Sequence, residues 1–373
     1  MININKVMSY DLKEIANAFA LDGVVAEVKQ LGDGFINDTF VVITENNGPR
    51  YILQRKNKNI FTDVPAMMNN IKMVTEHIKA KSIKAGGDPM REALTVIPAK
   101  DGKLYHKTTD DEFWAVCLFV EDTITYGAAD TPELAYQGGK GIGKFQKLLA
   151  DFDKELTDIL PGFHNMRFRY KQWDDAVKND AAGRVKNLAT EISWIEDRRV
   201  EMLKFWELVE KGVIPKRVTH NDTKINNILF DKQGEVLCVI DLDTVLGSIC
   251  LNDFGDAIRY VTNTGAEDDK NLDNVSMNLD IFKGYTEGYL SEAASFLTDK
   301  EIEYLAFSAR FITFEQVLRF LMDYINGDTY YRIKYPEHNI DRTRAQYKLL
   351  QCMEANMPKM QQIVKEAIAV YKK

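Results

Sequence analysis

The sequence predicts an α+β protein built in two lobes: a small N-terminal lobe around an antiparallel sheet, and a larger C-terminal lobe that is mainly helical. The chain has 373 residues, about twice the length of a typical domain. Short runs of branched and aromatic residues, separated by turn residues, precede Thr131, and helical patterns dominate after it. We therefore expect one lobe over residues 1–120 and the other over residues 121–373.

The N-terminal lobe is expected to hold this sheet and one helix, besides a short helix near residues 12–20. Glycine, asparagine and proline mark the turns between apolar runs, and strands joined by such short turns pair antiparallel. The predicted strands are 24–28, 39–44, 50–55, 93–98, 104–106 and 113–120. The helix is predicted over 64–81, between the third and fourth strands.

The C-terminal lobe is expected to begin its first helix at Thr131-Pro132-Glu133, where proline occupies the first helical turn. This helix contains Gly138-Gly139-Lys140-Gly141-Ile142-Gly143-Lys144-Phe145, which has the spacing of a phosphate-binding P-loop. No strand precedes it, and Phe145 stands where a serine or threonine would bind Mg²⁺. We interpret these glycines as sites of close helix packing. Further helical patterns cover 178–211, 274–291, 299–326 and 343–371.

Composition excludes several classes of protein. The net charge of −8 argues against nucleic acid or an anionic membrane as the main partner. The longest apolar run, Trp114–Val120, is far shorter than a membrane span, and residues 1–23 have no apolar leader pattern. The four cysteines are scattered, as buried inert thiols often are. We expect a cytoplasmic protein; its oligomeric state is left open.

The stretch from Val218 to Tyr260 carries the clearest chemistry. A polar loop, 219–227, leads into two apolar runs, 228–230 and 236–240, which are separated by a turn that contains Gly234. These runs are typical of a β-hairpin, because they are short and rich in branched and aromatic residues.

Such a hairpin would bring Asp222, Asn227 and Asp241 together. Phosphoryl transfer from ATP needs a carboxylate to orient and deprotonate the attacking hydroxyl, and oxygen ligands that hold Mg²⁺ on the phosphates. One loop carboxylate, an amide and a second carboxylate at a strand end would supply this set. The alternative is that these are turn-forming residues with no joint role.

The spacing resembles the catalytic loop and metal-binding aspartate of protein kinases. Asn221 replaces the usual arginine, and Leu242-Asp243 follows Asp241, so the chain is more similar to the aminoglycoside phosphotransferase and choline kinase superfamily. The resemblance implies a two-lobed protein-kinase-like fold, ATP and Mg²⁺ as cofactors, Asp222 as catalytic base, and Asn227 and Asp241 as metal ligands.

The same resemblance implies that His220 and Asp253 support the catalytic loop. Asp253-Phe254-Gly255 spells the metal-binding triplet of protein kinases, but no apolar strand delivers it. We expect a helix to start there, with Asn252 or Asp253 as its cap.

Nucleotide-binding residues are expected in the N-terminal lobe and at its end. Gly32 and Gly34 lie in a loop that could cover phosphates, although two glycines are also typical of a plain hairpin turn. The resemblance places the hinge that receives adenine at Phe119 and Glu121; a linker without a ligand is the alternative.

Kinases carry a phosphate-binding lysine on the third strand, and by strand order this position is Gln54. Either Gln54 suffices, or Arg55 or Lys56 is recruited through a bulge. The helix at 64–81 should supply a glutamate partner for the lysine, and Glu76 is available there.

Within the superfamily, the chain is most similar to the N-acetylhexosamine 1-kinases. The residues that carry this similarity are the loop 32–37, the block Arg319–Tyr324, and the segments 335–339 and 342–344. The resemblance implies that Asp222, Asn37, Arg319 and Tyr330 contact the sugar. Phe35 stands where that branch can have a histidine.

We therefore expect an ATP-dependent kinase that phosphorylates the anomeric hydroxyl of an N-acetylhexosamine. Two alternatives stay open. One is a kinase of the same fold acting on an aminoglycoside, choline, ethanolamine or homoserine. The other is a catalytically silent nucleotide-binding module, suggested by Gln54 in the lysine position.

Overall fold

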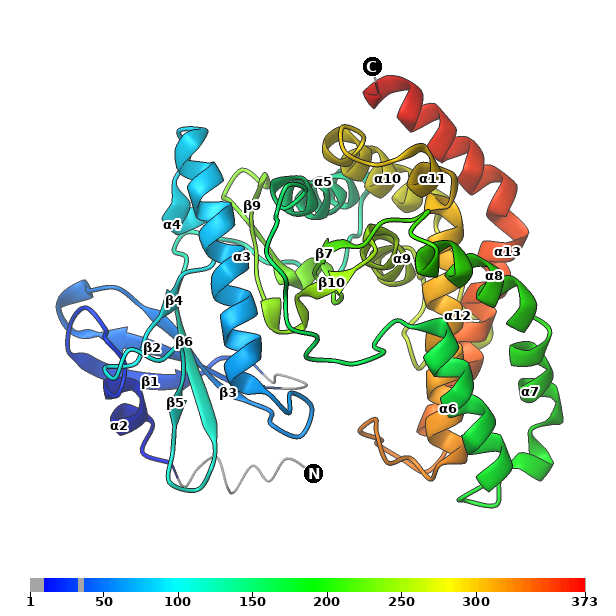
Figure 1. The fold of residues 1–373 in the computed structure, drawn as a ribbon, viewed down its shortest axis with the longest axis horizontal. Coiled ribbons are helices and arrows are strands. Elements are labelled where there is room, and N and C mark those ends of the chain that lie inside the picture. Colours follow the sequence, from blue (N-terminus) through cyan, green and yellow to red (C-terminus); the bar gives the residue numbers. More distant parts are fainter. Residues whose placement is uncertain (1–9, 33–36, 373) are drawn as a thin grey trace.

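The structure is a computed structural model that describes residues 10–32 and 37–372. It has an antiparallel sheet in the N-terminal lobe and a mainly helical C-terminal lobe, as predicted from the sequence (Figure 1). The last strand of the sheet ends at Leu118, and the first helix of the C-terminal lobe starts at Pro132. Across the described ranges, no helix is both long and apolar enough to span a membrane.

The sheet of the N-terminal lobe has the order β1-β2-β3-β6-β4, and β5 pairs with β6. Every one of these pairings is antiparallel. The fourth and fifth strands are shorter than predicted, two residues each. The bounds are β1 (Val25–Gln30), β2 (Asp38–Thr44), β3 (Tyr51–Lys56), β4 (Val96–Ile97), β5 (His106–Lys107) and β6 (Phe113–Leu118).

One face of this sheet buries Phe40, Leu53 and Trp114 against α2 (Leu12–Asn17). Because side chains alternate along a strand, the residues next to Leu53 in β3 point to the other face. That face carries the residues that meet the C-terminal lobe.

Helix α3 (Val64–Lys84) stands between the sheet and the C-terminal lobe (Figure 1). Its apolar side, including Met67 and Val74, belongs to the same hydrophobic core as the C-terminal helices. The amide of its buried Asn70 donates to the carbonyl of Thr157 at 2.8 Å, which fixes the helix to the larger lobe. The four-residue helix α4 (Pro89–Glu92) follows.

The helices of the C-terminal lobe surround one large core. The predicted helical segment 178–211 is broken, because the chain turns at Asp180 and Gly183, both in the left-handed region, before α7 and α8. The bounds are α5 (Pro132–Leu148), α6 (Met166–Asn179), α7 (Ala189–Glu196), α8 (Arg199–Glu210), α9 (Cys250–Val261), α10 (Leu279–Ala293), α11 (Asp299–Glu303), α12 (Leu305–Ile325) and α13 (His338–Tyr371).

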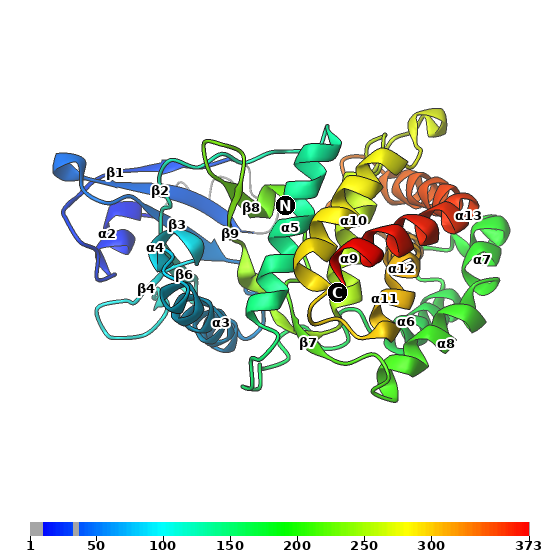
Figure 2. The same ribbon diagram turned by 90° about the horizontal axis from the view of Figure 1, so that it is seen from above.

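Of the glycines that mimic a P-loop, Gly139 and Gly143 lie on α5 where it packs against α10 (Figure 2), and Gly141 faces Ile228 and Val236 of the hairpin. A Cβ atom on Gly139 would lie 2.1 Å from the carbonyl oxygen of Tyr285, and one on Gly288 of α10 would lie 1.9 Å from that of Tyr136. Both helices therefore use glycine to let their backbones approach closely. This supports the packing interpretation over a phosphate site.

The predicted hairpin is formed by β8 (Ile228–Phe230) and β9 (Val236–Val239), which pair antiparallel. A second small sheet, β7 (Arg217–Thr219) with β10 (Leu246–Ser248), flanks it. Residues 220–227 of the polar loop connect β7 to β8.

Candidate active site

The buried carboxylate of Asp253 holds the start of the polar loop in place. Its two oxygens accept hydrogen bonds from the backbone N–H groups of His220 (2.9 Å) and Asn221 (2.7 Å). Helix α9 begins at Cys250 with Ile249 as its N-cap, so the prediction that Asn252 or Asp253 caps this helix was wrong. The carboxylate instead organises the loop.

The loop is also bonded to the turn that follows β9. The ring of His220 is fully buried; its Nε2 lies 2.8 Å from the carbonyl oxygen of Ile240, and its Nδ1 accepts from the N–H of Asp222. The side chain of Asn221, whose backbone is left-handed with φ 64°, donates to the carbonyl of Thr244 at 3.0 Å. Asparagine tolerates this conformation better than most residues, which accounts for its presence here.

Asp222, Asn227 and Asp241 lie together at the end of the hairpin. The amide of Asn227 lies 2.9 Å from the carbonyl oxygen and 3.4 Å from Oδ2 of Asp222. The N–H of Ile240 donates to the carbonyl of Asn227 at 2.9 Å, which places Asp241 beside it. Burial, and then the charges of Asp243 and Asp222, raise the pKa of Asp241 to about 6.

This donor set fits a Mg²⁺ ion bound together with nucleotide phosphates. Mg²⁺ takes oxygen ligands, keeps several waters, and is held in kinases by one or two carboxylates rather than by a complete protein cage. Burial first, and the neighbouring carboxylates second, raise the pKa of Asp241, and a bound cation would favour its ionised form. Among the residues that the structure describes, no three His, Cys, Asp or Glu side chains are arranged as a metal site by themselves.

A cation at the loop was missed by sequence reasoning. Lys224 Nζ lies 3.0 Å from Asp222 Oδ1 and 5.3 Å from the centre of the Tyr260 ring. Although burial lowers the pKa of Lys224, the charge of Asp222 and the proximity of Tyr260 raise it above its ordinary value. The spacing of two residues after Asp222 was visible in the sequence, but the direction of a loop side chain was not.

Gln54, which strand order selects for the phosphate-binding position, lies beside a lysine on the same face of β3. Gln54 and Lys56 share one face of β3, and β3 pairs regularly with β6 up to Lys56, so no bulge is needed. Lys56 Nζ lies 2.7 Å from Gln54 Oε1 and 2.7 Å from Asp243 Oδ1. The side chain of Gln54 therefore contacts Lys56 directly.

The expected glutamate partner on α3 is not used. Glu76 is exposed, and the ion pair that the structure records for Lys56 is with Asp243. Asn37 also contacts Asp243: its amide donates to Oδ2 at 2.7 Å, and its Oδ1 accepts from the N–H of Asn57. Of the two loop glycines, Gly32 has φ 67°, which favours glycine, whereas Gly34 lies outside the described residues.

The segment predicted as a hinge directly follows β6. The N–H of Phe119 donates to the carbonyl of Arg50, whose guanidinium lies over the Phe119 ring and pairs with the carboxylate of Glu121. Arg91 donates to the carbonyl of Glu121 at 3.0 Å. Both acceptor groups of Glu121 are thus engaged within the protein.

Arg319 and Tyr330, the other predicted sugar contacts, lie against each other. Arg319 Nη2 is 3.4 Å from the Tyr330 hydroxyl, and its guanidinium carbon is 5.4 Å from the Phe163 ring and 5.5 Å from the Tyr331 ring. Tyr330 is 64% exposed, so its ring is open to a ligand, whereas Arg319 lies deeper among the aromatic rings.

The loop that carries the two tyrosines is anchored by Asp323 on α12. Its buried carboxylate accepts the backbone N–H groups of Thr329, Tyr330 and Tyr331 at 2.8 to 2.9 Å, and the amide of Asn339 at 2.8 Å. The part played by Asp323 and Asn339 was not anticipated, although both lie in the segments that carry the sugar-kinase resemblance.

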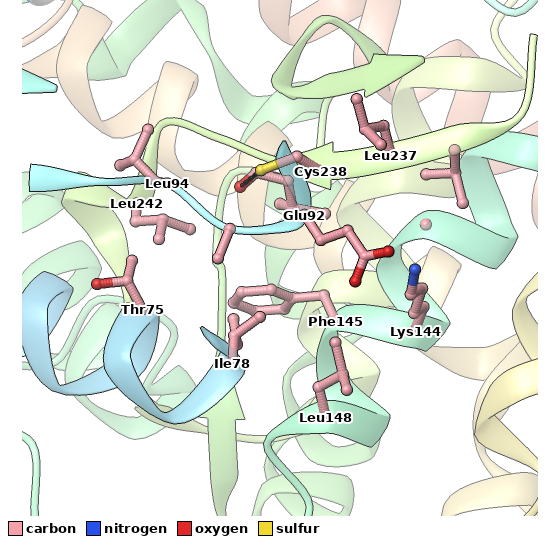
Figure 3. A pocket seen from close by; sticks show the side chains of 14 residues that line it. Thr75, Ile78, Glu92, Leu94, Lys144, Phe145, Leu148, Leu237, Cys238 and Leu242 are labelled. Carbon is pink, nitrogen blue, oxygen red and sulfur yellow. Dashed lines mark hydrogen bonds between the residues drawn. The ribbon is translucent and has the colours of Figure 1, made fainter. Parts of the chain in front are cut away.

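A small cavity of about 20 Å³ lies between β9 and helices α3, α4 and α5 (Figure 3). Glu92 and Lys144 point toward one another across it, close to Phe145 and Cys238. It has room for about one water molecule. It is therefore not the substrate site.

Comparison with known proteins agrees with this geometry. Residues 27–280, which include the sheet and the polar loop, match the model of the phosphotransferase enzyme family. The fold is similar to that of a microcompartment-associated aminopropanol kinase, with a TM-score of 0.62 and 16% identity over 94% of this chain and 98% of that one.

Two further solved structures share the fold. The aminoglycoside phosphotransferase of Alicyclobacillus acidocaldarius matches with a TM-score of 0.58 and 11% identity, over 95% of this chain and 96% of that one. A spectinomycin phosphotransferase, solved with ADP and spectinomycin, matches with a TM-score of 0.57 and 12% identity, over 93% and 97%. The polar loop, the hairpin and the family match lead to one conclusion: the chain belongs to the phosphotransferase enzyme family and has the fold of its small-molecule kinases.

Proposed function

We propose that this protein is an ATP- and Mg²⁺-dependent kinase that transfers the γ-phosphoryl group to the anomeric hydroxyl of an N-acetylhexosamine. The observation that carries the kinase part is the convergence of Asp222, Asn227 and Asp241 at the end of one hairpin. The presence of Lys56 near them weakens the alternative of a silent nucleotide-binding module, since that idea depended on Gln54 being in the lysine position.

In this mechanism Asp222 orients the sugar hydroxyl for in-line attack and accepts its proton. Lys56 holds the α- and β-phosphates, and Gln54 fixes the ammonium group. Asn227 and Asp241 would hold Mg²⁺, which neutralises the phosphate charge. Lys224, paired with Asp222, supplies a positive charge beside the transferring phosphoryl group in the transition state.

The nucleotide is proposed to enter under the loop that contains Gly32 and Gly34, with adenine at the segment Phe119 to Glu121. The carbonyl and the carboxylate of Glu121 already have arginine partners. Adenine would therefore hydrogen-bond to the backbone N–H of Glu121 and to the carbonyl of Phe119. The ADP bound by the similar spectinomycin phosphotransferase supports the use of an adenine nucleotide.

The acceptor assignment depends on Arg319 and Tyr330. Aromatic faces and a fixed cation suit a sugar that offers C–H patches, hydroxyls and an amide carbonyl. A cationic acceptor such as choline would be repelled by Arg319, whose pKa the neighbouring tyrosines and Glu315 raise despite its burial. The amide of Asn37 donates a hydrogen bond to Asp243. We therefore propose that Asn37 contacts the sugar only when the sugar replaces Asp243 as the acceptor of this hydrogen bond.

The alternative acceptor is a small amino alcohol or an aminoglycoside, which the similar solved structures favour by the substrates in their names. An assay of ADP release with Mg-ATP tests both acceptor assignments. The acceptors to compare are N-acetylglucosamine, N-acetylgalactosamine, the free hexosamines, an aminoglycoside, choline and ethanolamine. We expect ADP release with the N-acetylated sugars, and a ³¹P spectrum of an anomeric phosphate. Turnover with an amine and not with the sugars would contradict the proposal.

A further inference from the structure

One carboxylate of the C-terminal lobe holds two side chains of the N-terminal lobe. Asp243 accepts from Lys56 Nζ at 2.7 and 2.8 Å through its two oxygens, and from the amide of Asn37 at 2.7 Å. The three residues are 4%, 3% and 8% exposed. At this burial a charge needs a partner of fixed geometry, and the contact with both carboxylate oxygens provides one.

Asp243 is itself fixed to the catalytic loop. It lies in the short turn Leu242–Thr244, two residues after Asp241. The Thr244 hydroxyl donates to the carbonyl of His220 at 2.6 Å, and the Thr244 carbonyl accepts from Asn221. The position of Asp243 is therefore set by the segment that carries the candidate metal ligand.

Helix α3, in contrast, offers Lys56 no carboxylate. Glu76 is exposed, and the amide of the buried Asn70 donates to the backbone carbonyls of Thr157 at 2.8 Å and Val245 at 3.4 Å. Kinases that hold this lysine by a glutamate of the helix couple its position to movement of the helix. In this chain α3 has no carboxylate beside Lys56 through which its movement could act directly on the lysine; it reaches the segment after Asp243 through the amide of Asn70.

We propose that Asp243 is the positioning residue for Lys56, so that the phosphate-binding lysine is aligned by the metal-binding turn and not by helix α3. The proposal rests on the proposed role of Lys56 in holding phosphates. It implies that the lysine and the metal ligands keep one geometry and move as a unit.

The test compares Asp243→Asn with Glu76→Gln, which removes an exposed carboxylate from α3. Asp243→Asn keeps the shape of the side chain but loses the charge. We expect the KM for Mg-ATP to rise about tenfold, the equivalent of one charge-assisted hydrogen bond. Glu76→Gln should leave this value unchanged.

A second measurement separates this role from metal binding. The affinity for ATP is measured by calorimetry in EDTA, where Lys56 can still hold phosphates but no metal is present. We expect Asp243→Asn to weaken binding there as well. A loss seen only with Mg²⁺ would make Asp243 a metal ligand and overturn the proposal, as would an unchanged KM for Mg-ATP.

A double variant covers the case in which Asp243→Asn alone does not fold. Lys56→Met with Asp243→Asn removes both charges, a change that buried pairs tolerate better than loss of one partner. If Asp243 acts through Lys56, ATP affinity in the double variant equals that of Lys56→Met; a further loss would overturn the proposal. Because calorimetry uses no acceptor, a wrong acceptor assignment would show as absent sugar turnover with the ATP results intact.

Discussion

Lys224 Nζ lies 3.0 Å from Asp222 Oδ1, so the candidate base is paired with a cation. Transfer of a phosphoryl group spreads charge over its equatorial oxygens, and a preorganised cation stabilises that charge. We predict that Lys224→Met lowers kcat about 100-fold, in the range found for loss of one preorganised donor, while the KM for ATP changes little.

Lys224→Arg is the control for this prediction, since it keeps the charge but changes its shape. It should retain more activity than Lys224→Met. Equal kcat values for the methionine variant and the unsubstituted protein in steady-state assays would exclude a catalytic role for Lys224.

Replacing Asp222 by Asn should lower kcat by about two to four orders of magnitude, because the amide cannot accept the proton of the sugar hydroxyl. The melting temperature should stay close to that of the unsubstituted protein. Asp153→Asn, at an exposed aspartate, is the matched control and should be fully active. Near-normal turnover in Asp222→Asn would refute the assignment of the base.

The sequence sufficed to predict that Asp222, Asn227 and Asp241 lie together, because they are close along the chain and the hairpin that gathers them has strong turn and strand signals. It did not suffice for Lys56. Counting by strand order selected Gln54, and alternation puts Lys56 on the same face, but its partner Asp243 lies in a different lobe. Long-range pairs of this kind leave no local pattern.

Asp323 is predicted to shape the acceptor pocket through the backbone of Tyr330 and Tyr331. Asp323→Asn replaces one acceptor oxygen by a donor facing N–H groups. It should therefore raise the KM for the sugar about tenfold, the value of about one charge-assisted hydrogen bond, and leave the KM for ATP unchanged. Glu337→Gln, an exposed acid in the same loop, is the control. Parallel changes in both KM values would mean that Asp323 supports the fold alone.

Ionisation of Glu315 should make the free energy of unfolding depend on pH in the acid range. Burial alone would raise its pKa, but the charge of His164 and its hydrogen bond, with the charges of Arg169 and Arg319, lower the pKa to about 2. A depressed pKa contributes stability that is present above the unfolded pKa near 4.5 and is lost as pH falls toward 2. The contribution is at most about 3 kcal/mol.

Urea unfolding at about pH 5 and about pH 3 measures this effect. Glu315→Gln should be less stable than the unsubstituted protein at the higher pH, and its free energy of unfolding should fall less on acidification. An equal fall in both proteins would show that Glu315 does not titrate in this range.

The contact between α5 and α10 should not accept a methyl group. Gly288→Ala would place Cβ 1.9 Å from the carbonyl oxygen of Tyr136, so the helices must separate. Overpacking costs about 1–3 kcal/mol or more, which exceeds the gain of about 1 kcal/mol in helix propensity. Gly127→Ala, in open space, is the control. Thermal unfolding measures both; a Gly288→Ala variant as stable as the control would contradict the packing role.

The fold was predictable to the level of lobes and most elements, since turn residues and helical periodicity are local. The helical pattern at 178–211 was misleading, because amphipathic periodicity continues on both sides of the left-handed turn at Asp180 and Gly183. The cap assigned near Asp253 was wrong for a related reason. An aspartate near a helix start usually caps that helix, but here burial commits it to the loop above.

The glycine contact between α5 and α10 is connected by hydrogen bonds to Asp253, the residue that holds the polar loop. Tyr289, next to Gly288, donates its hydroxyl hydrogen to Gln146 at 2.6 Å, and Gln146 donates to Asp253 at 2.8 Å. A random screen for inactive variants should therefore recover substitutions at this contact, remote from every substrate, alongside those in the loop itself. Such variants would show a lowered kcat and an unchanged affinity for ATP.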